Sequence, residues 1–272
     1  MLSVFFDHLT EAAEQEGLSP EEMCAYAKRL GYDGVHMNFA SVTEENLALL
    51  KDAGLKVCSI FSFEDLSGGD TEENRARARE VIGRCRRAGC RMLMLLPGFL
   101  NEKTERGSAG YERLRQNMAA ALRAAVPLAE KEGVTLLLED FDGDRAPFCY
   151  SEELMWFLRE VPGLRCAFDT GNFAYADEDS GELLERFLPY ISDVHCKDRA
   201  FSPASGSPML SVGGRALYPC AVGDGDLPVA GIVRRLLECG YTGCFAAEHY
   251  GSARQKEDIA RSYAALRGMM RE

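Results

Sequence analysis

The chain has 272 residues, of which 43 are acidic and 31 basic, so its formal net charge is −12. An excess of acidic residues disfavours a nucleic-acid groove, because phosphate binding depends on lysine and arginine. No apolar stretch approaches the roughly 18 residues that a membrane-spanning helix requires. We therefore expect neither nucleic acid nor a membrane as a partner.

Ten cysteines are distributed along the chain without any Cys-x-x-Cys spacing. The N-terminal segment 1–7 has no basic leader before its short apolar run, so it does not resemble a secretion signal. We expect reduced cysteines, mostly buried, in a cytoplasmic protein. A zinc or redox pair of cysteines is the less favoured alternative.

Strand-like and helix-like segments alternate along the chain. The first strand is expected at Val4–Asp7, and the first helix begins at Ser19-Pro20 and ends at Gly31. The remaining strands are expected at 34–38, 56–63, 92–96, 134–139, 164–169, 191–195 and 244–248. The remaining helices are expected at 43–54, 71–89, 111–133, from 151, at 182–188, at 228–240 and from 255 to the C-terminus. Residues 199–226 are expected to form a long irregular loop that acts as a lid or an interface.

Eight strands and eight helices in alternation predict a single (β/α)8 TIM barrel, with residues 1–272 as one domain. The strands are continuously apolar, as is typical of a parallel sheet covered by helices. An open doubly wound sheet is the main alternative. It would need a glycine-rich phosphate turn after the first strand, and residues 6–10 do not provide one.

The last four predicted strands each end in a side chain that can bind a metal ion: Glu139, Asp169, His195 and Glu248. Active sites of such barrels lie at the carboxyl ends of the strands, so these side chains are expected to converge. Three carboxylates and one imidazole suit Mn2+, Mg2+ or Co2+ better than a structural zinc site. Separate salt bridges or helix caps at the barrel rim are the alternative interpretation.

The chain resembles the xylose isomerase-like barrels, specifically the sugar phosphate isomerase/epimerase group with ketose 3-epimerases, hydroxypyruvate isomerase and inosose dehydratase. The resemblance spans nearly the whole chain. It rests on Gly31-Tyr-Asp-Gly-Val35, Leu138-Glu139-Asp-Phe, Phe168-Asp169-Thr-Gly-Asn172, Val194-His195-Cys-Lys197-Asp198, Gly223-Asp-Gly225, Gly240-Tyr-Thr-Gly243 and Ala247-Glu248-His249.

The resemblance implies that Glu139, Asp169, His195 and Glu248 hold one divalent metal ion, with Mn2+ expected and Mg2+, Co2+ or Zn2+ as alternatives. It also implies that Glu139 and Glu248 act as acid and base. The expected reaction is isomerisation or epimerisation of a sugar or sugar derivative, by proton abstraction next to a carbonyl through a metal-stabilised enediolate. Whether the protein forms a homo-oligomer stays open.

Substrate contacts are expected from Lys197, Asn172, His36, His8, Arg199 and Arg215. For Lys197, an ion pair with Asp198 or Asp169 is an equal alternative. Two of these residues depart from the family pattern. Many relatives have a histidine at the position of Asn172 and an acid at the position of His36, so the identity of the sugar stays open.

Three other functions are weighed. A keto-cyclitol or keto-sugar dehydratase would use the same metal site, and a non-catalytic sugar-binding barrel would hold no stoichiometric metal. An apurinic endonuclease is disfavoured by the four histidines and the net charge of −12.

Overall fold

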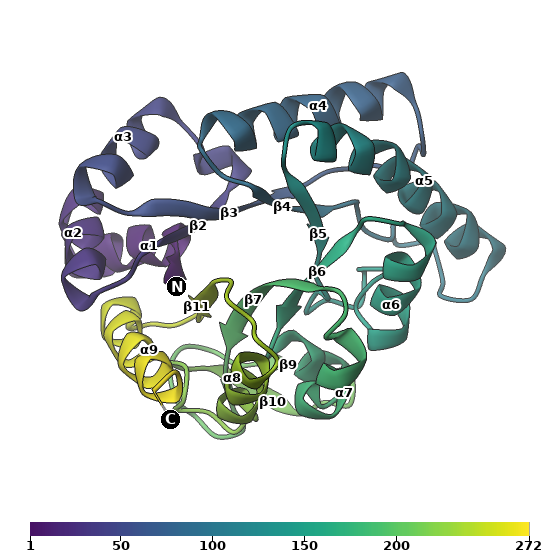
Figure 1. Ribbon diagram of the computed structural model, residues 1–272. Helices are drawn as coiled ribbons and strands as arrows, with labels where there is room; N and C mark the ends of the chain where they lie inside the picture. Colours follow the sequence, from purple (N-terminus) through teal and green to yellow (C-terminus); the bar gives the residue numbers. More distant parts are fainter. Residues whose placement is uncertain (272) are drawn as a thin grey trace.

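The computed structural model describes residues 1–271, which form a closed barrel of eight parallel strands (Figure 1). Around the barrel the strands follow the order β1 (Leu2–Phe5), β2 (Gly34–Asn38), β3 (Lys56–Phe63), β4 (Met92–Leu96), β5 (Thr135–Leu138), β6 (Arg165–Asp169), β7 (Ile191–Lys197) and β11 (Phe245–Glu248). Strand β11 pairs with β1 and closes the barrel. The predicted (β/α)8 TIM barrel is confirmed.

Helices surround the strands on the outside of the barrel (Figure 1). In chain order they are α1 (Phe6–Glu16), α2 (Pro20–Leu30), α3 (Glu44–Ala53), α4 (Glu72–Arg87), α5 (Ala109–Lys131), α6 (Ser151–Glu160), α7 (Ser180–Phe187), α8 (Val229–Glu238) and α9 (Gln255–Met269). Two short 3-10 helices, η1 (Phe39–Ser41) and η2 (Asn172–Ala176), follow β2 and β6. Helix α2 begins with the capping box of Ser19 and Glu22, and it ends at Gly31 with a φ of 115°.

The first strand ends earlier than predicted, and a helix follows it directly. Strand β1 stops at Phe5, and Asp7 and His8 belong to α1. The buried residues Phe6, Leu9 and Ala13 lie three to four positions apart, which is the spacing of an amphipathic helix. The expected strict alternation of eight strands and eight helices is therefore wrong at this point, because two helices separate β1 from β2.

Residues 199–226 are also more regular than predicted. They contain β8 (Arg199–Ala200), β9 (Met209–Leu210) and β10 (Ala216–Pro219), which form a separate three-stranded sheet in the order β8-β10-β9. Both pairings are antiparallel. This small sheet follows β7 directly, so it lies on the carboxyl-end side of the barrel, where side chains from the strand ends meet.

The core is apolar and contains most of the cysteines. Eight of the ten cysteines are buried, in agreement with their predicted role as small apolar residues. Within residues 1–271, no helix is long and apolar enough to cross a membrane.

Candidate metal and proton-transfer site

The four predicted side chains meet at the carboxyl ends of four adjacent strands. Asp169 and Glu248 are the last residues of β6 and β11, Glu139 follows β5, and His195 lies within β7. One ligand atom from each lies within 4.8 Å of the others, and all four residues are buried. The predicted convergence is confirmed, and the separate rim contacts of the alternative interpretation are not.

One carboxylate oxygen of the cluster, Asp169 Oδ2, accepts no hydrogen bond within residues 1–271 and lies 3.6 Å from Lys197 Nζ, so it tests whether a cation fits. Asp169 accepts hydrogen bonds through Oδ1 from the backbone N–H groups of Gly171 (2.6 Å) and Asn172 (2.7 Å). Its Oδ2 is buried and has no hydrogen-bond partner. Such an oxygen is costly to bury unless something pairs with it. A divalent cation among these donors would satisfy Asp169 Oδ2, so the four residues fit a divalent cation.

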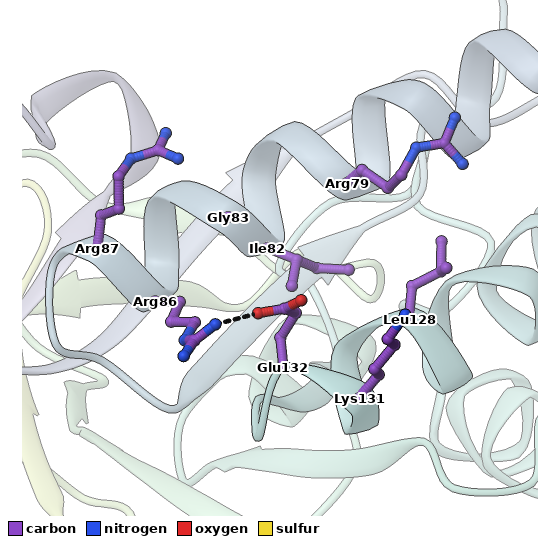
Figure 2. Close-up of a pocket in the computed structure, with 8 residues that line it drawn as sticks. All are labelled: Arg79, Ile82, Gly83, Arg86, Arg87, Leu128, Lys131 and Glu132. Carbon is purple, nitrogen blue, oxygen red and sulfur yellow. Dashed lines mark hydrogen bonds and ion pairs between the residues drawn. The ribbon is translucent and has the colours of Figure 1, made fainter.

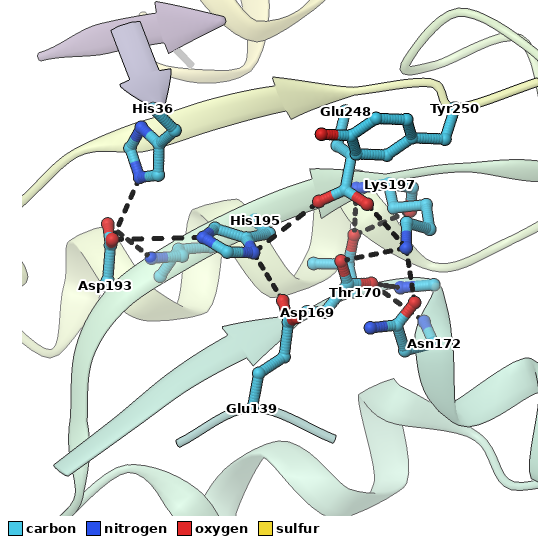
Figure 3. Close-up of polar contacts among 12 residues, drawn as sticks. His36, Glu139, Asp169, Thr170, Asn172, Asp193, His195, Lys197, Glu248 and Tyr250 are labelled. Carbon is cyan, nitrogen blue, oxygen red and sulfur yellow. Dashed lines mark hydrogen bonds and ion pairs between the residues drawn. The ribbon is translucent and has the colours of Figure 1, made fainter. Parts of the chain in front are cut away.

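The raised pKa values of the two glutamates also indicate a cation site. His195 Nδ1 hydrogen-bonds to Glu139 Oε1 and lies 3.5 Å from Glu248 Oε2 (Figure 3). Burial, and after it the charge of Asp169, raises the pKa of Glu139 well above its usual range. Burial raises the pKa of Glu248 to about 8, although the charge of Lys197 opposes the shift. Crowded buried carboxylates of this kind are stabilised by a cation.

Among residues 1–271, Lys197 provides the only ammonium group that lines the cavity at these strand ends. Its Nζ lies 2.6 Å from Glu248 Oε1 and 3.6 Å from Asp169 Oδ2, and it hydrogen-bonds to Asn172 Oδ1 (Figure 3). Burial lowers the pKa of Lys197, but the charges of Asp142, Asp169 and Glu248 outweigh it and raise that pKa well above its usual value. Lys197 therefore stays charged. Its carboxylate partners include Asp169, whereas Asp198 is not one of them.

Asp198 instead anchors the segment that follows the small sheet. Its carboxylate accepts hydrogen bonds from the backbone N–H groups of Gly223 (2.9 Å), Gly225 (3.0 Å) and Leu227 (3.2 Å). A Cβ atom at Gly225 would collide with this carboxylate, so the position requires glycine. The Gly223-Asp-Gly225 turn thus serves Asp198 and not the four-residue cluster.

A cavity of about 330 Å³ opens at the cluster and is lined by polar and apolar side chains. The polar ones are Asp7, Asn38, Glu139, Asp142, Asn172, Lys197 and Glu248, and the others are Phe5, Phe61, Phe63, Met94, Phe141 and Tyr250. The rings of Phe61, Phe63 and Phe141 pack on one another and form an aromatic wall. Phe63 remains 45% exposed, packs edge to face on Phe141 and stacks on Phe99.

Comparison with known proteins agrees with this arrangement. The family described as "Xylose isomerase-like TIM barrel" matches residues 24–269. The chain belongs to this family. Among solved structures, the D-allulose 3-epimerase from Methylomonas sp. is similar, with 15% identity over 98% of this chain and 97% of that one and a TM-score of 0.73.

Two further solved structures share the barrel. The probable 3-DHS dehydratase from Bacillus anthracis is 16% identical over 98% of both chains, with a TM-score of 0.73. A xylose isomerase-like TIM barrel protein from Mycobacterium smegmatis, in complex with magnesium, is 20% identical over 90% of this chain and 88% of that one, with a TM-score of 0.63. At these identities the likeness establishes the fold alone.

In this xylose isomerase-like barrel, the residues expected to contact substrate occupy different places. Lys197 and Asn172 line the cavity. Arg199 lies behind it, with its guanidinium 3.1 Å from Asp142 Oδ2. Arg215 lines a separate cavity of about 300 Å³ and places its guanidinium 4.9 Å from the ring centre of Phe201.

His8 and His36 do not line the cavity either. His8 is buried in α1, where its Nε2 accepts a hydrogen bond from the backbone N–H of His249 (3.0 Å). His36 lies inside the barrel, 2.9 Å from Asp193 through Nε2. Burial lowers the pKa of His36, but the charge and hydrogen bond of Asp193 outweigh it and raise that pKa. The two residues form a buried ion pair below the cluster.

Several cavity residues escaped the sequence analysis. Asp142 and Tyr250 lie three and two residues beyond Glu139 and Glu248, and this proximity to predicted ligands was the signal that could have found them. The aromatic wall gave a weaker signal. Phe61 and Phe63 alternate along the end of β3, which is the spacing of residues on one face of a strand.

A larger cavity of about 480 Å³ lies on the outside of the barrel, between α4 and α5 (Figure 2). It is lined by Arg79, Ile82, Gly83, Arg86, Arg87, Leu128, Lys131 and Glu132. Arg86 pairs with Glu132 at 2.5 Å, and Arg79 pairs with Glu72. Most arginines of helix α4 thus have an acidic partner nearby.

Proposed function

We propose that the protein is a divalent-metal-dependent isomerase or epimerase acting on an unphosphorylated sugar or sugar derivative. The observation that carries the proposal is the buried convergence of Glu139, Asp169, His195 and Glu248, with one oxygen of Asp169 lacking a hydrogen-bond partner. These four residues would hold the cation. Mn2+ is the expected ion, with Mg2+, Co2+ or Zn2+ as alternatives, and the Mycobacterium smegmatis relative was solved with magnesium.

The two glutamates have the placement that proton transfer requires. When bound, a cation of this kind polarises a substrate carbonyl and makes the adjacent C–H more acidic. Glu248 belongs to β11 and Glu139 follows β5, and strands β7 and β6 lie between these two strands. Both glutamates line the cavity. One carboxylate removes the proton from the carbon next to the carbonyl, and the other returns a proton to its opposite face. The configuration at that carbon is thereby inverted.

Lys197 and Asn172 orient the substrate in this proposal. The ammonium of Lys197 lies beside Glu248 and points into the cavity, so it can donate hydrogen bonds to substrate oxygens where negative charge develops. The hydrogen bond between Lys197 and Asn172 Oδ1 fixes the ammonium in place, and Asn172 Nδ2 is itself held by the backbone oxygen of Asp140 (2.8 Å). Both groups are therefore preorganised.

The cavity walls favour an uncharged substrate. Among residues 1–271, Lys197 is its only cationic lining residue, against the carboxylates of Asp7, Glu139, Asp142 and Glu248. These four carboxylates outnumber the charges of Lys197 and a divalent cation together, so a phosphate group would still meet net negative charge, which is unfavourable in a low-dielectric site. The aromatic wall around Phe63 suits the C–H faces of a sugar ring or an apolar substituent. We therefore infer a neutral substrate with one apolar face.

A substrate panel in D2O tests the proposal. Metal-loaded protein is incubated with free ketoses, their phosphates, keto-glycosides and keto-cyclitols, and the products are analysed by NMR after the metal is chelated. The proposal expects isomers that carry solvent deuterium next to the carbonyl, formed from unphosphorylated compounds. A protein without stoichiometric metal and without turnover of any compound would instead support a non-catalytic sugar-binding barrel.

Dehydration of a keto-sugar or keto-cyclitol is the second candidate. It begins with the same proton abstraction and then expels a hydroxyl group, which needs a nearby hydrogen-bond donor. The ammonium of Lys197, 2.6 Å from Glu248, supplies such a donor within reach of the same substrate. Water loss in the D2O panel, in place of deuterated isomers, would select this reaction.

A further inference from the structure

A second polar group lies deeper in the barrel, toward the amino ends of the strands, and Figure 3 shows it to the left of the four-residue cluster. His36 of β2 and Asp193 of β7 face each other across the barrel interior, with Nε2 and Oδ2 2.9 Å apart. Ser3 of β1 lies 2.9 Å from His36 Nδ1. All three residues are buried, and they line none of the cavities described above.

His195 lies between this deeper group and the cluster. Its Nδ1 faces Glu139 and Glu248. Its Nε2 is buried, lacks a hydrogen-bond partner and lies 3.9 Å from Asp193 Oδ2 (Figure 3). That separation exceeds the usual N–H···O distance of about 2.9 Å by roughly 1 Å. A small rotation of the His195 ring would close it.

Asp193 is well placed to accept this hydrogen bond. It lies two residues before His195 on β7, so both side chains point into the barrel. Its neighbour on β6 is Ala167, whose small side chain leaves room beside the carboxylate. His36 and the backbone N–H of Val194 (3.1 Å) already hold Asp193 from two directions. The carboxylate is therefore fixed before any metal binds.

Metal-binding histidines almost always donate their other ring N–H to a carboxylate or carbonyl group, which sets the tautomer and orients the ring. We propose that Asp193 is the positioning residue for His195: it accepts the Nε2–H, so that Nδ1 presents its lone pair to the cation. His36 holds Asp193 in turn through Nε2, and its ring packs edge-on against that of His195, with ring centroids 5.1 Å apart. This inference rests on the proposed metal site.

A purely structural role for the pair predicts something different. If His36 and Asp193 only joined β2 to β7, removing either would affect the metal site equally. If Asp193 orients His195, only its replacement matters. His36→Gln keeps a hydrogen-bond donor toward Asp193, whereas Asp193→Asn removes the negative acceptor. The comparison of the two variants separates the roles.

The experiment measures Mn2+ affinity by titration calorimetry on chelator-stripped protein. Asp193→Asn is expected to weaken binding about 10- to 100-fold, and His36→Gln is expected to stay within about threefold of wild type. The matched control is Asp258→Asn, which replaces another fully buried carboxylate, held by Ser252 at 2.6 Å and remote from the cluster. Circular dichroism checks that each variant is folded.

Nitrogen-15 NMR of the histidines supplies an independent readout. In wild-type protein loaded with diamagnetic Mg2+, the Nε2–H proton of His195 is expected to show the downfield shift of a hydrogen bond to a carboxylate, and Asp193→Asn is expected to reduce that shift. Should Asp193→Asn fail to fold, Asp193→Glu replaces it, with an intermediate loss of affinity expected.

Three results would overturn the inference. Equal affinities for Asp193→Asn and wild type would leave the proposed metal site intact but remove the role of Asp193. Binding of two equivalents of Mn2+ by the wild type, with one equivalent lost in Asp193→Asn, would also remove this role. In that case His36, Asp193 and His195 would hold a second ion. Absence of any metal binding by the wild type would overturn the proposed function and this inference together.

Discussion

Lys197 Nζ lies 2.6 Å from Glu248 Oε1, with both side chains buried at the carboxyl ends of adjacent strands β7 and β11. This contact joins the group that carries positive charge in the cavity to one of the two groups proposed to move a proton.

Replacing Lys197 is expected to destabilise the protein strongly. Lys197→Met leaves Glu248, Asp169 and Asp142 without their shared cation in a buried site, which costs about 3–5 kcal/mol in the free energy of unfolding of the metal-free protein. Urea denaturation measures this difference. The control is Lys256→Met, whose exposed pair with Glu16 is worth at most about 1 kcal/mol. Similar losses in both variants would contradict the account.

Glu248 is expected to contribute a loss of stability to the metal-free protein as pH rises from about 4.5 to about 8, which the lowered pKa values of the buried His8 and His249 oppose below about pH 6.5. The pKa of Glu248 is raised from 4.5 to about 8 in the folded protein, so the folded state binds the extra proton in this window. Stability then falls with pH, by at most about 1.4 kcal/mol per pH unit from this group. Thermal unfolding from pH 4 to 9 shows the slope. Glu248→Gln should reduce it, and an unchanged slope would contradict the shifted pKa.

Each proposed proton-transfer residue is expected to be required for turnover. Glu139→Gln and Glu248→Gln keep the size of the side chain but remove the proton acceptor, so kcat should fall about 100- to 10,000-fold. Substrate assays together with circular dichroism separate lost chemistry from lost folding. Wild-type turnover in either folded variant would refute that residue's role.

The aromatic wall is expected to contribute to substrate binding. Phe63→Ala removes an exposed ring from the cavity and should raise KM about 5- to 10-fold with little change in kcat, since the ring contacts substrate and not the reacting atoms. Phe201→Ala is the matched control, because Phe201 is similarly exposed, at 41% against 45%, but lines a different cavity. Equal KM changes in the two variants would argue against the apolar wall.

The sequence was sufficient to predict the barrel and the four-residue cluster, for local reasons. An apolar strand that ends in Asp169 or Glu248 is visible along the chain, and parallel strands bring their carboxyl ends to one face. Lys197 lies two residues after His195 on β7, so the alternation of a strand turns both side chains to the same face. These predictions needed only the order and period of the elements.

What the sequence did not predict depends on contacts between distant segments. The pair of His36 and Asp193 joins residues 157 positions apart, and it requires the register of β2 and β7 around a closed barrel. The small sheet of residues 199–219 pairs short strands across a turn-rich segment, with no apolar alternation to mark them. Helix α1 was missed because the apolar run of β1 continues directly into Phe6.

The most direct test of the central claim is the metal content of the purified protein, measured by mass spectrometry of the bound elements after dialysis against Mn2+. The account predicts one equivalent of divalent cation per chain in wild type and less than about a tenth of that in Asp169→Ala, which removes a buried carboxylate ligand whose Oδ2 accepts no hydrogen bond within residues 1–271. Wild-type protein without stoichiometric metal, or equal metal content in a folded Asp169→Ala variant, would contradict it.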